Sequence, residues 1–425
     1  MTRPSVALVT LALLAAGTSR AETEVTGTLD AWLGLTDNAQ SAPDNSVPGV
    51  PEKKADGFGI LAPGLAVSGG SRRVLHRLGA TTSVTLHYSE RDADTWSNRL
   101  EYQGLFALHP RTSLFLGANA MTTRAWSASL ISPATELGAT LQHSGTTLSL
   151  AAEEQLSHDL TRSFSGTQSA RFAFGSPLEG ERRPYSTDTL VGVGLERTFR
   201  GDAVGAELRE ELATISEPRV RQLTSTGVAI HRHDFGRSFT SRLEAGVLRV
   251  DRLTSGRHFW HPSALAALAF AEQGGSAELR YSHRAATSVQ VGQTLLVDEV
   301  RLTGVLPLVQ PRTLVLAGAC AYQRGRVIEE DASRGARLDV TLVDLALAWQ
   351  AAPGLGLGLR YQHTRQLSDG TVPPDPLSYR RNTLLAGATL SWPPETETRR
   401  PLRPPQRVDR SDDVLRSRGE QRRVD

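Results

Sequence analysis

The chain of 425 residues is poor in cysteine and lysine, with one cysteine, Cys320, and two lysines, Lys53 and Lys54. A single cysteine excludes an intramolecular disulfide and any metal site built from several cysteines. Beyond residue 21 the sequence contains no run of about 18 apolar residues. Because the mean hydropathy is also only −0.27, a helical membrane protein is not expected. The 47 basic residues nearly balance the 45 acidic ones, so nothing indicates nucleic-acid binding.

The usual catalytic motifs are missing as well. The sequence has no HExxH, no GxSxG and no phosphate-binding Gly-Lys-Ser/Thr loop. His231 and His233 form an H-x-H pair, but without a third ligand they predict no zinc site. Glu153 and Glu154 are adjacent strand positions that point to opposite faces, so they form no carboxylate dyad. We therefore predict no enzyme activity, no metal and no cofactor.

The first 21 residues have the features of a secretory signal. Arg3 gives a positive start, residues 6–17 form a short apolar stretch, and Ser19-Arg20-Ala21 places small residues around a cleavage site. An ordinary buried helix is the less favoured alternative. We expect residues 1–21 to be removed and the mature chain to be exported.

Apolar and polar residues alternate with a period of two along most of the remaining chain. In residues 355–362, Leu and Tyr alternate with Gly, Arg and Gln, and residues 82–89 and 277–282 behave alike. This pattern is typical of half-buried strands. Because the second face is small, polar or charged, a barrel with a wet lumen is favoured over a secreted sandwich or propeller.

Short turn signals rich in Gly and Pro separate the strands. They are centred on Gly70, Pro110, Gly145, Gly201, Gly236, Gly274, Pro311 and Pro353. With an opening and a closing strand, these turns predict an all-β transmembrane antiparallel β-barrel of about 18 strands over residues 22–392. An even number places both termini on the tight-turn side, which is periplasmic in outer-membrane barrels. Two long loops are expected, at residues 36–56 and 157–186.

The last predicted strand carries a more specific pattern. Gly387, Leu390 and Trp392 fit the glycine-x-x-hydrophobic-x-aromatic spacing of the signal that outer-membrane barrels present to their assembly machinery. Leu385 departs from the pattern, in which a polar residue is usual. Residues 393–425 contain nine Arg and seven acidic residues among several prolines. We predict that they form a disordered periplasmic tail.

Polar residues that alternate with apolar ones are candidates for the lumen face. These pore-lining candidates carry both charges: Glu101, Glu136, Glu207, Arg209, Glu211, Arg242, Glu244, Glu278, Arg280, Glu299, Arg301, Arg360 and Gln362. Ion pairing between neighbouring strands is the favoured role, ahead of ligand binding. A wall of mixed charge suits a hydrated, neutral or weakly charged solute. The set is short of tryptophan and tyrosine, so no aromatic ladder for sugars is expected.

Three functions remain open: an export channel for a hydrophilic polymer, a passive porin for small solutes, and a structural or adhesive barrel. General porins narrow their lumen with a long third loop. Here the third loop is expected at residues 123–132 and is short, so an ordinary porin is less favoured. Strands begin soon after the signal, so a plugged TonB-dependent transporter is not expected.

In strand number, length and the lack of a plug, the chain resembles the eighteen-stranded barrels of exopolysaccharide export pathways in Gram-negative bacteria. The high ratio of arginine to lysine is typical of high-GC members of that group. The resemblance covers the mature chain and has no diagnostic motif. It implies a polysaccharide export channel in the outer membrane, surrounded by outer-membrane lipid. The partners it implies are the barrel assembly machinery and a periplasmic polysaccharide-export protein.

Overall fold

The computed structural model describes residues 23–393, except 45–51, 72, 130–139, 179–184, 217–218, 237, 273–274, 289–292, 310–312, 329–336 and 370–377. The predicted signal at residues 1–21, the tail beyond residue 393 and the pore-lining candidate Glu136 lie outside the described residues. In the part of the chain that is described, no helix is long and apolar enough to span a membrane.

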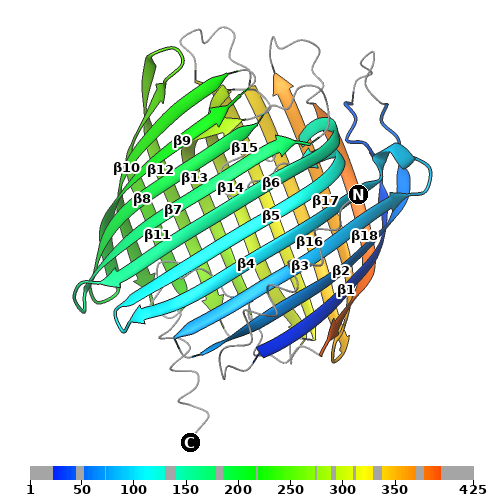
Figure 1. Ribbon diagram of the computed structural model, residues 1–425, viewed down its shortest axis with the longest axis horizontal. Coiled ribbons are helices and arrows are strands. Elements are labelled where there is room, and N and C mark those ends of the chain that lie inside the picture. The colour runs from blue at the N-terminus through cyan, green and yellow to red at the C-terminus, as the bar shows by residue number, and fades with distance from the viewer. Residues whose placement is uncertain are drawn as a thin grey trace, which may run out of the picture.

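Eighteen strands make up almost all of the described chain (Figure 1). They are β1 (Thr23–Thr36), β2 (Asp56–Ser71), β3 (Val74–His87), β4 (Thr95–His109), β5 (Thr112–Ser129), β6 (Thr140–Asp159), β7 (Phe164–Pro177), β8 (Ser186–Thr198), β9 (Asp202–Ile215), β10 (Val220–Phe235), β11 (Phe239–Arg252), β12 (Arg257–Glu272), β13 (Gly275–Ser288), β14 (Gln293–Val309), β15 (Leu314–Val327), β16 (Arg337–Ala352), β17 (Leu355–Asp369) and β18 (Tyr379–Trp392). One short 3-10 helix, Arg91–Ala93, lies between β3 and β4.

Each strand pairs antiparallel with its neighbours in sequence, and the sheet closes between the first and the last strand. β1 and β18 pair from Gly27 opposite Trp392 to Thr36 opposite Thr383. Closure satisfies the backbone groups that an open edge would leave unpaired in lipid. The predicted closed antiparallel barrel and its strand number are thus confirmed. Which membrane side the termini face stays a prediction.

The predicted turn at Ser144-Gly145 was wrong. Both residues lie inside β6, where the register against β5 shifts between Ala125 and Ser127. A glycine inside a strand often marks such a bulge, and its local signal resembles that of a turn. The tight turn lies instead between Asp159 and Phe164.

The loops between β5 and β8 therefore also differ from expectation. The expected long fourth loop, residues 157–186, contains β7, and the fourth connection is only residues 178–185. The third connection is residues 130–139, outside the described part, and the expected loop at residues 123–132 is mostly β5. The third connection therefore lies at another place than expected, but it is no longer than the expected loop.

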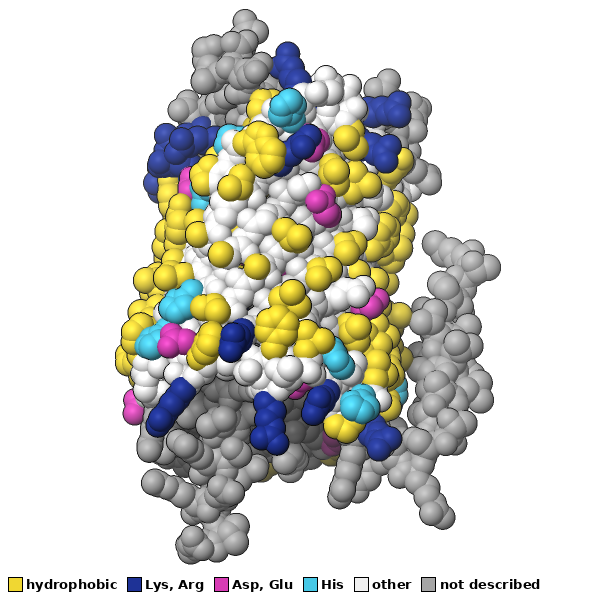
Figure 2. Space-filling model, turned by 90° about the vertical axis from the view of Figure 1, so that its left-hand side faces the viewer, with side chains coloured by type: hydrophobic (Ala, Val, Ile, Leu, Met, Phe, Trp, Pro, Cys, Tyr) yellow, Lys and Arg dark blue, Asp and Glu magenta, His cyan; other side chains and the backbone are white. Residues whose placement is uncertain are grey.

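The outer face of the barrel is apolar. Large exposed side chains recur at every second position, as with Leu33 and Leu35 in β1 and Val191, Val193 and Leu195 in β8. In Figure 2 hydrophobic side chains line both flanks and are scattered over the middle of the face, and most Lys and Arg side chains gather toward its two ends. This is the exterior of a transmembrane barrel.

Aromatic residues lie near both ends of this apolar band. Phe235 and Phe239 flank the tight turn between β10 and β11, and Trp392 ends β18. Toward the other end, Tyr322 and Tyr361 are exposed on the outer face. Such girdles mark the two membrane–water interfaces. We call the end with the tight turns the turn end, and the opposite end the loop end.

Candidate channel lumen

All described pore-lining candidates lie at inward-facing positions. Residues directly opposite each other in an antiparallel pair share a face, so the register can be followed from the exposed outer residues around the barrel. The inward set comprises Glu101, Glu207, Arg209, Glu211, Arg242, Glu244, Glu278, Arg280, Glu299, Arg301, Arg360 and Gln362.

A group of ion pairs links β9 to β11 across the inner wall. Arg209 Nε lies 2.9 Å from Glu207 Oε1, and its Nη2 lies 3.5 Å from Glu244 Oε2. The Nε of Arg242 donates to Glu244 Oε1 at 2.8 Å. Glu244 is buried between the two arginines. Two of these pairs lie within a single strand and the third reaches across β10, so these side chains do not form the pairs between adjacent strands expected from the sequence.

Two further groups of ion pairs continue around the same wall. Arg171 in β7 lies 2.7 Å from Asp188 in β8. Glu299 in β14 pairs with Arg301 at 3.3 Å and with Arg284 in β13 at 3.6 Å. The wall therefore neutralises most of its charge internally, which leaves a polar surface with weak net charge.

Glu278 and Arg280 differ from these braced residues. Both are exposed, and neither forms an ion pair with any described residue. They face the lumen two positions apart on β13, opposite the small residues Ala269 and Ala267 of β12. A solute in the lumen can therefore contact these two charges without first breaking an ion pair.

A cavity of about 1290 Å³ occupies the lumen beside these charges. Small residues of β15 to β17, such as Ala319, Ala346 and Gly358, form much of its wall. Asp344 and Arg360, joined by a hydrogen bond of 2.8 Å from Arg360 Nε, add a paired charge. A second recess of about 250 Å³ is lined by residues that include Arg77, Arg99 and Glu101. The turn-end half of the lumen is thus roomy, with small residues and a few charged side chains on its wall.

Among the described residues, a tryptophan that the predicted lumen set did not include faces the lumen. Trp32 in β1 lies opposite Gly387 of β18 and lines the large cavity. A Cβ on Gly387 or Gly358 would lie 2.5 and 2.6 Å from atoms of its indole ring. The ring therefore lies over two glycines at the closing seam. Alternation could not assign Trp32 to the lumen face because its neighbours Ala31 and Leu33 are apolar as well.

The loop-end half of the inner wall is packed rather than open. Val250, Val297, Val340 and Gln366 face inward with an exposed fraction of 0% each. Arg381 of β18 also faces inward, and its Nη1 donates to Ser41 Oγ of the first connection at 3.0 Å. The lumen is consequently narrower toward the loop end than toward the turn end.

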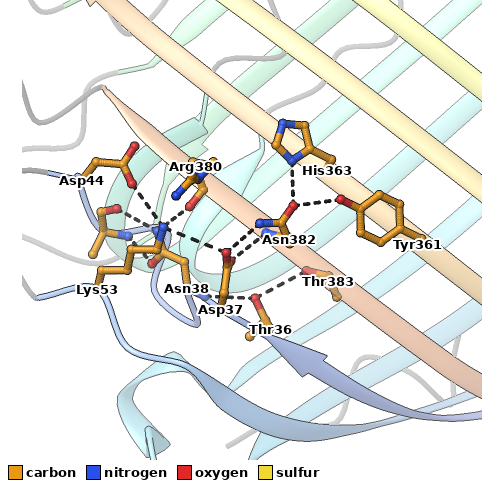
Figure 3. A network of polar contacts seen from close by, with 11 residues as sticks. Thr36, Asp37, Asn38, Asp44, Lys53, Tyr361, His363, Arg380, Asn382 and Thr383 are labelled. Carbon is orange, nitrogen blue, oxygen red and sulfur yellow. Dashed lines mark hydrogen bonds and ion pairs between the residues drawn. The ribbon is translucent and has the colours of Figure 1, made fainter.

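A polar network fixes the first connection to β18 (Figure 3). Asn38 is fully buried, and its Nδ2 donates to the carbonyl oxygens of Ala42 at 2.8 Å and Arg380 at 3.0 Å. Asp37 accepts from the backbone N–H of Asn382 at 2.7 Å and from its side-chain amide at 2.6 Å. Residues far apart in the sequence are thus locked together where the barrel closes.

Several inward charges escaped the sequence analysis. They are Asp30, Arg77, Arg99, Glu153, Arg171, Asp188, Glu196, Arg232, Arg284 and Asp344. The signal that could have revealed them is a charge between two apolar neighbours, as in Val343-Asp344-Leu345. β7 was read as a loop, so Arg171 had no predicted face at all.

The residues proposed as an assembly signal divide between the two faces. Leu390 and Trp392 point outward and are exposed, whereas Gly387 faces the lumen beneath Trp32. Recognition of these residues by an assembly machinery stays a prediction. A glycine is needed at this inward-facing position because the indole ring of Trp32 packs directly over it.

The histidine pair lies on the outer face and is engaged with one carboxylate. His233 Nδ1 and His231 Nε2 lie 2.7 and 3.2 Å from Asp202 Oδ1. No group of three metal-binding residues is present within the described ranges. Cys320 also points outward and is exposed.

A closed barrel with a lipid-facing exterior and a polar lumen is the architecture that crosses the bacterial outer membrane. The chain is accordingly an outer-membrane barrel that encloses a channel. No protein-family model and no curated protein matches its sequence.

Similar folds occur among solved structures. One is Pseudomonas aeruginosa OccK2 (OpdF) in complex with glucuronate, with 14% identity and a TM-score of 0.47 over 88% of this chain and 98% of that one. Another is P. aeruginosa OpdK with vanillate, with 10% identity and a TM-score of 0.48 over 87% and 99%. The siderophore receptor PirA from P. aeruginosa has 9% identity and a TM-score of 0.44 over 88% and 81%.

Proposed function

We propose that the barrel is a passive outer-membrane channel for small hydrophilic solutes. The observation that carries this proposal is the cavity of about 1290 Å³ inside the closed wall. Its lining combines small residues, the paired charges Asp344 and Arg360, and the unpaired Glu278, which lies two positions from Arg280 on β13. Such a wall offers weak contacts at many points, which favour entry without retention.

The size of the solute follows from the two halves of the lumen. The turn-end half holds the cavity, while inward side chains in the loop-end half, such as Val340 and Gln366, are fully buried. A narrowed passage suits small solutes better than a hydrated polymer. Polysaccharide export, which the sequence resemblance implied, gains no support from this geometry or from the similar structures.

Single-channel recording of the purified barrel in planar bilayers tests the proposal. We expect open channels whose ion selectivity shifts toward anions in Glu278→Gln and toward cations in Arg280→Gln. Arg249→Gln is the matched control, because Arg249 points outward and pairs with Asp251. A barrel without conductance, or equal selectivity in all variants, would refute the proposal.

A deletion strain distinguishes the three functions in the cell. Slowed uptake of small sugars with normal surface polymer supports the passive channel. Polymer that is made but held inside the envelope would instead establish export. Normal uptake and normal polymer would favour a structural barrel.

A further inference from the structure

The outer surface of the last four strands carries a concentration of arginine at the loop end. Arg365 of β17 lies directly opposite Arg380 of β18, and Arg326 of β15 lies directly opposite Arg337 of β16. Like charges in directly opposite positions destabilise a sheet. Two such pairs on neighbouring hairpins therefore call for a source of negative charge.

Carboxylates of the barrel do not supply enough of it. Asp339 accepts from Arg337 at 2.7 Å and from Arg324 at 3.1 Å, so its charge is already shared. Arg326, Arg365 and Arg380 form no ion pair with a described carboxylate, and all three are exposed. Asp298 and Asp37 interact with Arg326 and Arg380 only through longer-range attraction, and among the described residues Arg365 has not even that. By register, Asp369 lies opposite Arg337, the one arginine of these pairs that already has a carboxylate.

An inward-facing pair of the same kind provides a comparison. Arg232 lies opposite Arg242 across β10 and β11, yet each has its own carboxylate, Glu196 at 3.3 Å and Glu244 at 2.8 Å. The barrel thus neutralises this facing arginine pair inside the lumen. It leaves Arg365 and Arg380 without an ion-paired carboxylate on the surface that meets the membrane, although Asp37 attracts Arg380 from a longer distance.

The height of the arginines on the barrel indicates what they meet. Tyr322 of β15 and Tyr361 of β17 lie on the outer face, as the arginines do. Each tyrosine is two residues nearer the membrane centre than Arg324 and His363 of the same strands. Their hydroxyls donate to Asp339 at 3.2 Å and to Asn382 at 2.9 Å. Figure 3 shows Tyr361 and His363 both reaching Asn382, which lies between Tyr361 and Arg380. Tyrosines of an aromatic girdle lie at head-group level, so the arginines beyond them reach the polar surface of the leaflet.

We propose that this outer-rim arginine cluster, Arg326, Arg365 and Arg380, binds the phosphate groups of anionic lipids in the leaflet at the loop end. Guanidinium groups bind phosphate oxygens through paired, charge-assisted hydrogen bonds. A phosphate between Arg365 and Arg380 converts their repulsion into a bridge across β17 and β18. That bridge adds to the network that holds β18 to the first connection.

The test measures binding of diphosphoryl lipid A to the full-length folded barrel in neutral detergent micelles. We expect the affinity of the double variant Arg365→Gln/Arg380→Gln to fall roughly thirty-fold, because each arginine near an anionic membrane surface strengthens binding about five-fold. Arg326→Gln tests the second pair alone and should lose less. The matched control is Arg73→Gln/Arg200→Gln, which removes two exposed arginines at the turn end.

A thermal readout separates a binding role from a structural one. Without lipid, the double variant should unfold at the same temperature as the wild type or higher, because a repulsion has been removed. With lipid A, the wild type and the control should gain stability and the double variant should not. Equal gains in all proteins, an equal gain with phosphatidylcholine or inorganic phosphate, or a destabilised double variant without lipid would overturn the proposal. Conductance should be unchanged in every variant, so failure here is distinct from failure of the channel.

Discussion

At the scale of single residues, the closing seam depends on the absence of side chains at two positions. Trp32 lies over Gly358 and Gly387, which belong to neighbouring strands. A large indole next to glycines fills the inner wall without a void, and any added methyl group must displace the ring. The glycine that the sequence pattern assigned to an assembly signal therefore has a packing function as well.

Gly387→Ala should weaken the folded barrel. The new Cβ would meet both the indole ring and the carbonyl oxygen of Ala31, and overpacking of this kind costs about 1–3 kcal/mol. Gly356→Ala is the control, because its Cβ would come no nearer than 3.9 Å to Thr389. Thermal unfolding in detergent measures both. An unchanged unfolding temperature for Gly387→Ala would contradict the packing described here.

Asp37 makes the first connection sensitive to acid. Burial acts to raise the pKa of Asp37, but the amide donors of Asn382 and the charge of Lys53 outweigh it and hold the pKa below its usual value. The carboxylate therefore stabilises the fold above its unfolded pKa of about 3.9, and this contribution is lost as the pH falls through the lower folded value.

We expect Asp37→Asn to lower the unfolding temperature at pH 6 and to lower it less at pH 3. The exposed Asp92, changed to Asn, is the control and should matter at neither pH. A difference between wild type and Asp37→Asn that is as large at pH 3 as at pH 6 would show that the carboxylate charge is not its cause.

At the scale of elements, β18 decides whether the sheet closes. It pairs with β17 on one side and with β1 on the other, and its last residue, Trp392, is 73% exposed on the outer face. Removing an outward aromatic at the interface weakens the anchoring of the strand that completes the barrel. The residues beyond Pro393 are not needed for any of these pairings.

Trp392→Ala should therefore reduce the yield of folded barrel in the membrane more than deletion of residues 394–425. Quantifying the folded form of each variant by its gel mobility checks this. Failure of the truncated chain to assemble, together with normal assembly of Trp392→Ala, would contradict the role of Trp392 in completing the barrel.

At the scale of the whole molecule, every strand is paired on both sides. Such a structure has no edge from which unfolding can begin, and closed barrels in lipid lose their backbone bonds only together. We expect the protein to fractionate with the outer membrane and to migrate differently on gels before and after boiling. Recovery in the soluble periplasm with a single mobility would refute the membrane barrel.

The amino-acid sequence alone determined the class of fold and its strand number. Alternation with a period of two is a local property, and so are the glycines and prolines of the tight turns. The same local character explains the error at Ser144-Gly145, since a bulge and a turn use similar residues. It also allowed the faces of charges such as Glu207 and Arg209 to be assigned from their neighbours.

Only the tertiary structure decided which charges neutralise each other and how wide the passage is. Glu244 meets Arg209 from two strands away, and Asn38 meets Arg380 from the far end of the sequence, because closure brings β1 to β18. Alternation fixes the face of a side chain but not its height or its partner, which depend on the register. The narrowed loop-end half and the unpaired arginines of the outer rim follow from register and closure together, which no local pattern encodes.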